Sequence, residues 1–361
     1  MKVVTVVGAR PQFIKTAVVS RELRKSNQEI LVHTGQHYDD NMSEIFFREM
    51  DIPKPDYNLG IAGGSHGKMT GNMLIAVEEV LLKENPDALL VYGDTNSTLA
   101  AALAAVKLHI PVFHVEAGNR LGTLHNPEEV NRICTDHVSS LLMCCTDSAK
   151  AFLDREGLGD RALVVGDPMY DAFLYYSNKQ KDEVMKDVID LAGNVVNTPE
   201  EFYYMTCHRE ENTNHEDKLI EILEAVNSLD APTIYPVHPR NRNKVKEICG
   251  ENSFKNILLT QPFGYLQSIK LVKNAKKIVT DSGGLQREAF FAKVQCVTVF
   301  DFVVWPETMI DKANQLAKPD REDILSKLSV AVQWNDDYQP FGAGDSAEKI
   351  VKAMKERLNG I

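Results

Sequence analysis

A serine and two glycines that follow an apolar run are the clearest candidates for chemistry in this sequence. They lie in TDSGGLQRE, residues 280–288, which reads as a strand, a turn and a helix start. Glycines let a backbone approach a ligand closely, and N–H groups at a helix start attract phosphate. Glu288 lies at helical spacing from Ser282 and could accept from ribose hydroxyls. A turn capped by Ser282 would explain the same residues without a ligand.

Two further polar runs each follow an apolar stretch of the second half. HREEN at 208–212 follows 202–206, and HPR at 238–240 follows 233–237. A lone His or Arg after a strand is more often a solvated loop residue. The carboxyl ends of neighbouring parallel strands meet in one crevice, so we expect these cations and the Ser-Gly-Gly turn to meet at a diphosphate.

Two carboxylates follow apolar runs of the first half, in GDTNS at 93–97 and HVEAG at 114–118. Asp94 could simply cap the helix expected at 96–108. Glu116 ends a buried run, where an unpaired carboxylate is costly, so it needs a partner or a ligand.

The run NPEEVNR is typical of a helix start. Asn126 is the expected cap, Pro127 the first helical residue, and Glu129 the residue that completes a capping box. Glu128 is then left to face a cleft, although pairing with Arg132 one turn later is a structural alternative.

The first turn, GARPQFIK at 8–15, carries Arg10 and Lys15 and suits an anion. It is not GxGxxG, and no acidic residue is placed to hold a nicotinamide ribose, so a dehydrogenase is disfavoured.

Most of the candidate residues follow apolar runs, so they need strands to position them. Short apolar runs alternate with segments of helical period along the chain, which is typical of an α/β fold with a parallel sheet. We expect two Rossmann-like α/β domains facing each other across a cleft. The predicted domains span 1–175 and 176–345, with a polar stretch at Ser177–Glu201, and an amphipathic helix in 346–361 is expected to pack back on the first domain. The predicted strands are Val3–Val7, Ile30–Thr34, Ala88–Tyr92, Val112–Val115, Leu141–Cys145, Leu163–Val165, Phe202–Thr206, Thr233–Val237, Ile257–Thr260, Lys277–Asp281 and Cys296–Val299. In the first half, helices are predicted near 11–25, 40–50, 67–84, 96–108, 127–137 and 147–155.

Composition narrows the class of protein. The chain has 361 residues and a net charge of −11, which disfavours a nucleic-acid-binding or membrane-surface protein. Its 6 cysteines form no CxxC pair or metal-ligand spacing, so no metal is expected. The start has no signal-peptide pattern, and a cytoplasmic location is expected.

Taken together, these motifs resemble the non-hydrolysing UDP-N-acetylglucosamine 2-epimerase family. The resemblance runs in order and spacing from residue 1 to about residue 310, and it includes HTGQHYD at 33–39 and PEEVNR at 127–132. It implies a GT-B-like fold, a homodimer and no cofactor. Details such as GARPQFIK and REAFF look closest to the branch that acts on UDP-2,3-diacetamido-2,3-dideoxyglucuronic acid.

The resemblance also implies the chemistry. The C2 proton of the sugar is poorly acidic, so its removal needs UDP to leave, which gives a 2-acetamidoglucal intermediate. By motif, Asp94, Glu116 and Glu128 match the family's catalytic acids, and His208 matches the residue beside the leaving diphosphate. The expected substrate-binding residues are Arg10, Lys15, Arg132, Arg209, His238, Phe263, Ser282, Gly283, Gly284 and Glu288.

One departure from the family pattern follows the last predicted strand. An Arg and a Glu that usually face the ligand are replaced by Phe300 and Val304. Apolar groups at these positions would favour a less charged or more deoxygenated sugar.

Three other functions fit the same residues. A hydrolysing epimerase would release UDP and free sugar, and a glycosyltransferase would need an acceptor. A non-catalytic UDP-sugar sensor would bind without exchange at C2. The carboxylate trio makes the last two weaker.

Overall fold

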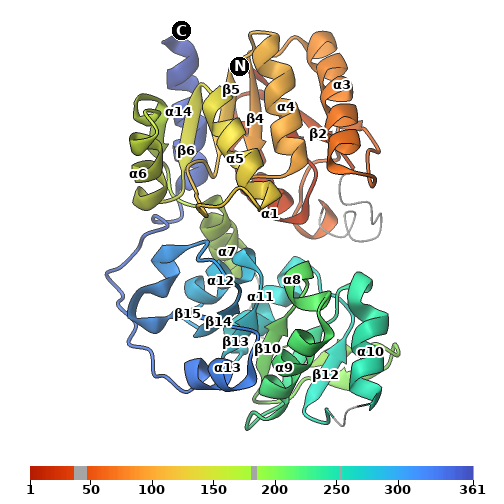
Figure 1. Cartoon of the computed structure of the whole chain (residues 1–361). Coiled ribbons are helices and arrows are strands. Elements are labelled where there is room, and N and C mark those ends of the chain that lie inside the picture. The colour runs from red at the N-terminus through yellow and green to blue at the C-terminus, as the bar shows by residue number, and fades with distance from the viewer. Residues whose placement is uncertain (36–46, 180–184, 252–253, 361) are drawn as a thin grey trace. The chain divides into compact units, whose positions relative to one another are not determined.

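The structure is a computed structural model that describes residues 1–35, 47–179, 185–251 and 254–360. Its internal contacts divide the chain into two compact units. Unit 1 comprises Met1–Tyr175 with Gln339–Ile361, and unit 2 comprises Tyr176–Tyr338. In Figure 1, each unit has its own sheet with helices packed against it. The chain therefore passes between the units twice, within helix α7 (Pro168–Lys179) and after Tyr338.

Among the described residues, the sheet of unit 1 has seven strands in the order β3-β2-β1-β4-β5-β6-β7, all parallel. Its central strands are nearly continuous apolar runs, as expected for a parallel sheet buried on both faces. The strands are β1 (Lys2–Val7), β2 (Gln28–His33), β3 (Tyr57–Asn58), β4 (Ala88–Tyr92), β5 (Val112–Val115), β6 (Leu141–Cys144) and β7 (Ala162–Val164).

The helices of unit 1 connect these strands and bring polar loops to the carboxyl ends of the sheet. Gly8 in the first turn has no room for a side chain, since a Cβ there would lie 2.2 Å from Ser97 Oγ. The helices are α1 (Arg10–Leu23), α3 (His66–Glu84), α4 (Asn96–Lys107), α5 (Pro127–Val138), α6 (Asp147–Arg155), the first part of α7, and α14 (Ser346–Asn359).

Unit 2 repeats the architecture. Over its described residues it has a six-stranded parallel sheet in the order β12-β11-β10-β13-β14-β15. Its strands are β10 (Tyr203–Thr206), β11 (Thr233–Pro236), β12 (Ile257–Thr260), β13 (Ile278–Thr280), β14 (Cys296–Val299) and β15 (Asn314–Ala317). Its helices are α8 (Glu210–Thr213), α9 (Glu216–Asn227), α10 (Arg242–Glu251), α11 (Tyr265–Asn274), α12 (Gly283–Phe291) and α13 (Arg321–Leu328).

The predicted α/β class and the predicted strands are confirmed, but the polar stretch Ser177–Glu201 is more than a linker. It contains the antiparallel hairpin of β8 (Asp187–Ile189) and β9 (Val195–Asn197). The hairpin forms because Val188 is only 2% exposed and joins the core beside Phe202, although charged residues surround it in sequence.

Other predictions are corrected by the structure or fall outside the residues it describes. Strand β15 was not predicted, because Asn314–Ala317 is only partly apolar. The segment 339–345, assigned from sequence to the second domain, packs with unit 1, where Asp167 N–H donates to the Phe341 carbonyl at 2.9 Å. Residues 36–39 of HTGQHYD and most of the helix expected at 40–50 lie outside the described residues. Within the described ranges, no helix combines the length and apolarity that crossing a bilayer requires.

Candidate functional site

Glu116 lies at the carboxyl end of β5 and forms a buried ion pair with Lys15. The Lys15 Nζ and Glu116 Oε2 atoms are 2.5 Å apart, and the side chains are 2% and 10% exposed. Lys15 reaches this position from α1, and Glu116 adopts a left-handed backbone conformation with φ of 69°. The carboxylate that the sequence placed at a buried strand end therefore has the cationic partner that burial demands.

Asp94 follows β4 and pairs with Arg132 of α5. It does not cap α4, because Thr95 is the capping residue and accepts from the Thr98 N–H. Arg132 also pairs with Glu129, so its guanidinium bridges two carboxylates. Burial alone would lower the pKa of Arg132, but the charges and hydrogen bonds of Asp94 and Glu129 raise it well above its ordinary value. The bridge thus holds Asp94 to the start of α5.

The first turn of α5 is capped as predicted by Asn126, whose side chain accepts from the Glu129 N–H at 3.0 Å. Glu129 does not close the predicted capping box, because its Oε1 instead accepts from the N–H groups of Leu121 at 2.8 Å and Gly122 at 3.0 Å. Its carboxylate is used to fix the preceding loop.

Glu128, on the same turn, is exposed. The structural alternative of a Glu128–Arg132 pair is not recorded among the described residues, since the Arg132 guanidinium contacts Asp94 and Glu129. Glu128 is the most solvent-accessible of the three carboxylates predicted to be catalytic.

Behind these groups lies a buried network that the sequence did not reveal. His114 of β5 contacts Asp136 of α5 through Nδ1 and the Gly93 carbonyl through Nε2, both at 2.7 Å. Arg120 donates to the other Asp136 oxygen at 2.7 Å. Burial alone would raise the pKa of Asp136, but the hydrogen bond and charge of His114, together with Arg120, hold it below its ordinary value. The network fixes the backbone on the N-terminal side of Asp94 and Glu116.

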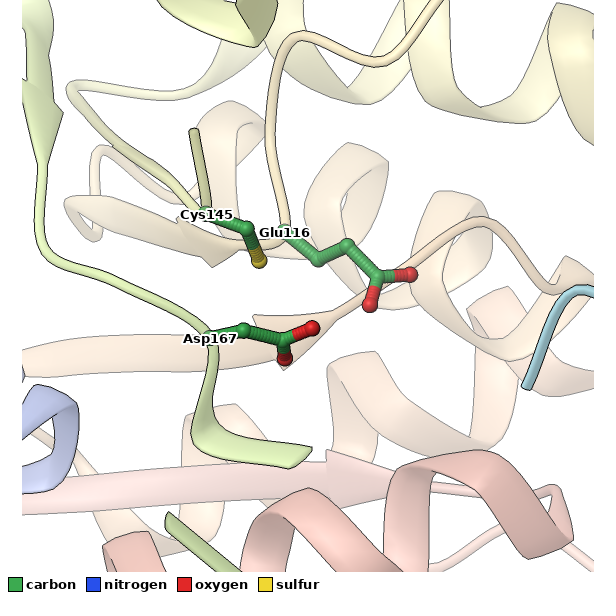
Figure 2. A group of neighbouring side chains, drawn as sticks. All are labelled: Glu116, Cys145 and Asp167. Carbon is green, nitrogen blue, oxygen red and sulfur yellow. The ribbon is translucent and has the colours of Figure 1, made fainter. Parts of the chain in front are cut away.

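Two more polar side chains lie beside Glu116, as Figure 2 shows. Polar atoms of Glu116, Cys145 and Asp167 all lie within 4.8 Å of one another. A thiol and two carboxylates are potential metal ligands, but the Lys15 ammonium already neutralises Glu116. Asp167 also accepts from the Met169 N–H at 2.9 Å at the start of α7. Sequence reasoning missed Cys145 and Asp167, although both follow strands of this sheet as Glu116 does.

In unit 2, the predicted loops after β10 and β11 come together. The His208 and His238 rings stack with centroids 6.4 Å apart and planes 27° apart. Arg240 Nη1 contacts Glu210 Oε1 at 2.9 Å and links the same two loops. Arg209 lies with its guanidinium carbon 4.0 Å from the centre of the Phe300 ring. Two predicted histidines and an arginine thus gather at the carboxyl edge of this sheet.

The Ser-Gly-Gly turn begins α12, as predicted. Ser282 is its capping residue and accepts from the Leu285 N–H at 3.4 Å. Capping explains Ser282, yet the first N–H groups of any helix lack a partner within the helix and so remain suited to a phosphate. Gly283 lies beside Val304, one of the two residues that depart from the family pattern. A Cβ at Gly283 would lie 3.6 Å from Val304 Cγ1.

The remaining predicted residues are placed as follows. Gly284 is part of the same first turn, and Glu288 is a buried residue of α12 at 6% exposure. Phe263 belongs to the hydrophobic core of unit 2 rather than to its surface. Arg10 is the first residue of α1 and is half-buried. The catalytic and binding roles of all these residues stay predictions.

Comparisons with known proteins find matches over nearly the whole chain. The family model described as UDP-N-acetylglucosamine 2-epimerase matches residues 21–355. A Methanococcus maripaludis protein named as a UDP-N-acetylglucosamine 2-epimerase homolog is 46% identical, over 98% of this chain and 99% of that protein. The Pseudomonas aeruginosa UDP-2,3-diacetamido-2,3-dideoxy-D-glucuronate 2-epimerase is 43% identical over the same shares.

A solved structure agrees with these matches. Methanocaldococcus jannaschii UDP-GlcNAc 2-epimerase, in complex with UDP-GlcNAc and UDP, superposes with a TM-score of 0.85 at 38% identity, covering 99% of this chain and all of that one. The expected GT-B-like fold is confirmed. The chain belongs to the UDP-N-acetylglucosamine 2-epimerase family of UDP-sugar isomerases.

Proposed function

We propose that this protein is a non-hydrolysing 2-epimerase that interconverts UDP-GlcNAc and UDP-ManNAc. The reaction proceeds by anti-elimination of UDP, which gives 2-acetamidoglucal, and by re-addition of UDP with a proton on the other face of C2. The C2 proton leaves to a carboxylate, and the C1–O electron pair leaves with the diphosphate. Charge therefore appears at two places that the protein must stabilise.

The observation that carries the proposal is the arrangement of carboxylates in unit 1. Asp94 and Glu116 end neighbouring strands, and each is paired with a buried cation, Arg132 or Lys15. Such pairing fixes both carboxylates in place. Glu128 is exposed and close in sequence to Arg132, which suits a group that meets the substrate.

Unit 2 supplies groups suited to the UDP moiety. His208, Arg209 and His238 follow adjacent strands, and the Gly283–Gly284 turn starts α12. Cations and helix-start N–H groups are the usual partners of a diphosphate, so we assign these residues to the leaving group.

A second substrate has support, because the Pseudomonas relative is named for UDP-2,3-diacetamido-2,3-dideoxy-D-glucuronate. The loop after β14 argues for the neutral sugar. Phe300 is 6% exposed and packs its ring on Arg209, and Val304 lies beside Gly283. Because Phe300 and Val304 are both apolar, neither position provides a cation to pair with the carboxylate of a uronic sugar. We therefore propose faster turnover of UDP-GlcNAc than of the uronic substrate.

The test is to incubate the purified protein with each UDP-sugar and resolve the epimers by anion-exchange chromatography. We expect a manno product from UDP-GlcNAc without accumulating UDP. Equal turnover of both substrates would refute the proposed preference. UDP rising in step with free sugar would instead identify a hydrolysing epimerase, and an absolute need for an acceptor would identify a transferase.

Substitution of each predicted catalytic carboxylate tests where the reaction takes place. Asp94→Asn, Glu116→Gln and Glu128→Gln are each expected to abolish turnover while leaving UDP binding, measured by calorimetry, largely intact. Glu322→Gln, an exposed change on α13, is the matched control and should behave as wild type. Retained turnover in all three acid variants would refute the site. A homodimer and a cytoplasmic location stay predictions.

A further inference from the structure

Asp281 is a buried carboxylate that the catalytic scheme above does not use. It follows β13 directly, and its side chain is 1% exposed. It accepts from the backbone N–H groups of His208 at 2.9 Å and Arg209 at 2.8 Å. A third contact comes from the ring of His208, whose Nδ1 lies 3.1 Å from Asp281 Oδ1.

These donors keep Asp281 charged. Burial alone would raise its pKa, but the charge and hydrogen bond of His208 and the backbone N–H groups of Arg209 and His208 lower the pKa to about 2. An ionised carboxylate can only accept hydrogen bonds. The Nδ1 atom of His208 faces this carboxylate, so the tautomer with a proton on Nδ1 is the one that matches the contact.

The other edge of the His208 ring has a different environment. The side chain of His208 is 42% exposed, in contrast to the buried Asp281. No hydrogen bond of Nε2 is recorded within the described parts of the chain. The ring is thus contacted by Asp281 at Nδ1, while the side chain as a whole stays partly open to solvent.

We propose that Asp281 is a positioning residue for His208, which it orients so that Nε2 meets the departing diphosphate. This inference rests on the proposed function. A carboxylate at Nδ1 fixes the orientation of the ring, as in other Asp-His pairs, and does not itself take a proton. The Nε2–H then donates to a phosphate oxygen as the C1–O bond breaks, and the interaction strengthens as the leaving group gains charge.

A merely structural role has to be separated from this one, because Asp281 also holds the backbone at 208–209. Asn212 provides the control. Its side chain donates to Asp281 at 3.3 Å and to the Val299 carbonyl at 3.0 Å, and its recorded bonds do not involve the His208 ring. Asn212→Ala therefore perturbs the loop and spares the ring contact.

The kinetic experiment compares Asp281→Asn, Asn212→Ala, His208→Gln and the Asp281→Asn/His208→Gln double variant. We expect Asp281→Asn to lower kcat by roughly ten- to a hundredfold, the worth of one hydrogen bond to a charged group. The KM of Asp281→Asn should change by a smaller factor than its kcat. The loss of kcat in Asn212→Ala should be smaller than that in Asp281→Asn. In the His208→Gln background, Asp281→Asn should cause little further loss. An undiminished loss in that background, or an equal loss in Asn212→Ala, would overturn the proposal.

A measurement on the wild-type protein does not depend on variant folding or on turnover. Nitrogen-15 NMR of the protein saturated with UDP, with the His208 signal assigned by its loss in His208→Gln, reports which ring nitrogens are protonated. We expect protons on both ring nitrogens. A bare Nδ1 would contradict the pairing with Asp281, and a bare Nε2 would contradict donation to the diphosphate. If no UDP-sugar is epimerised, the proposed function fails, yet this measurement still decides the contact.

Discussion

At the level of single residues, two of the three predicted catalytic carboxylates are held in ion pairs with buried cations. Lys15 and Glu116 illustrate this pairing, because neither side chain is more than 10% exposed and each is the recorded partner of the other. A buried charge that loses its partner is strongly destabilising, whereas removal of both charges is often tolerated. Pairing here therefore serves both stability and the placement of a carboxylate.

A double-mutant cycle tests the Lys15–Glu116 pair. Lys15→Met should lower the free energy of unfolding by about 3–5 kcal/mol, because it removes the Lys15 ammonium from beside the buried Glu116 carboxylate. Adding Glu116→Gln to Lys15→Met should restore a large part of that loss, measured by urea denaturation. Losses that simply add in the double variant would show that the two side chains do not interact.

Sequence reasoning reached some of these residues and not others. It found Asn126 as a cap because capping depends on neighbours within one turn. It predicted that the Glu129 carboxylate closes a capping box, whereas the carboxylate accepts from the Leu121 and Gly122 N–H groups. These donors are brought to Glu129 by tertiary folding, which no local pattern reveals. It could not pair His114 with Asp136, since 22 residues separate them and no local pattern links them.

At the scale of elements, one buried network joins β5, α5 and the loop after β4. Asp136 is its centre and accepts from Arg120 and from the Gly118 N–H at 3.1 Å, while it contacts His114 at 2.7 Å. The network fixes the direction in which the two strand ends present Asp94 and Glu116.

The network predicts a dependence of stability on pH. The pKa of Asp136 is lower in the folded protein than in the unfolded chain, because His114 and Arg120 outweigh the effect of burial. Its contribution is therefore fully present above the unfolded pKa of about 3.9 and is lost as the pH falls through the folded pKa. Asp136→Asn should be less stable than wild type at pH 7, and the gap should narrow below pH 4.

Urea unfolding monitored by circular dichroism between pH 3 and pH 7 measures that gap. Asp154→Asn, which removes the exposed ion pair with Lys150 on α6, is the control and should change stability at pH 7 much less than Asp136→Asn does. A gap for Asp136→Asn that stays constant or widens on acidification would contradict the assigned charge.

At the scale of the whole molecule, the end of the chain completes unit 1. Helix α14 packs against α1, and Ala347 N–H at its start donates to Asp171 of α7 at 2.8 Å. The amphipathic pattern of this helix was visible in the sequence, and Ile350 and Met354 are fully buried as that pattern implies. The sequence placed this helix on the first domain, but its contact with α1 in particular could not be derived from local pattern, because that contact spans most of the chain.

Ile350→Ala tests whether α14 stabilises unit 1 in particular. Removing this buried side chain should cost about 2–5 kcal/mol. Both tryptophans, Trp305 and Trp334, lie in unit 2, so tryptophan fluorescence reports on that unit alone. We expect the unfolding transition seen by circular dichroism to begin at lower denaturant, while the fluorescence midpoint stays in place.

Lys352→Ala is the control on the same helix, since that side chain is 75% exposed. It should leave both signals unchanged. An equal shift of both midpoints in Ile350→Ala would show that the two units unfold as one.

The central claim, reversible loss of the C2 proton with departure of UDP, is tested most directly by proton NMR of the protein with UDP-GlcNAc in D2O. We expect deuterium at C2 of the gluco sugar, a growing UDP-ManNAc signal that is also deuterated, and little free UDP. Measurable UDP binding with the C2 proton retained in both UDP-GlcNAc and UDP-2,3-diacetamido-2,3-dideoxyglucuronic acid would contradict it.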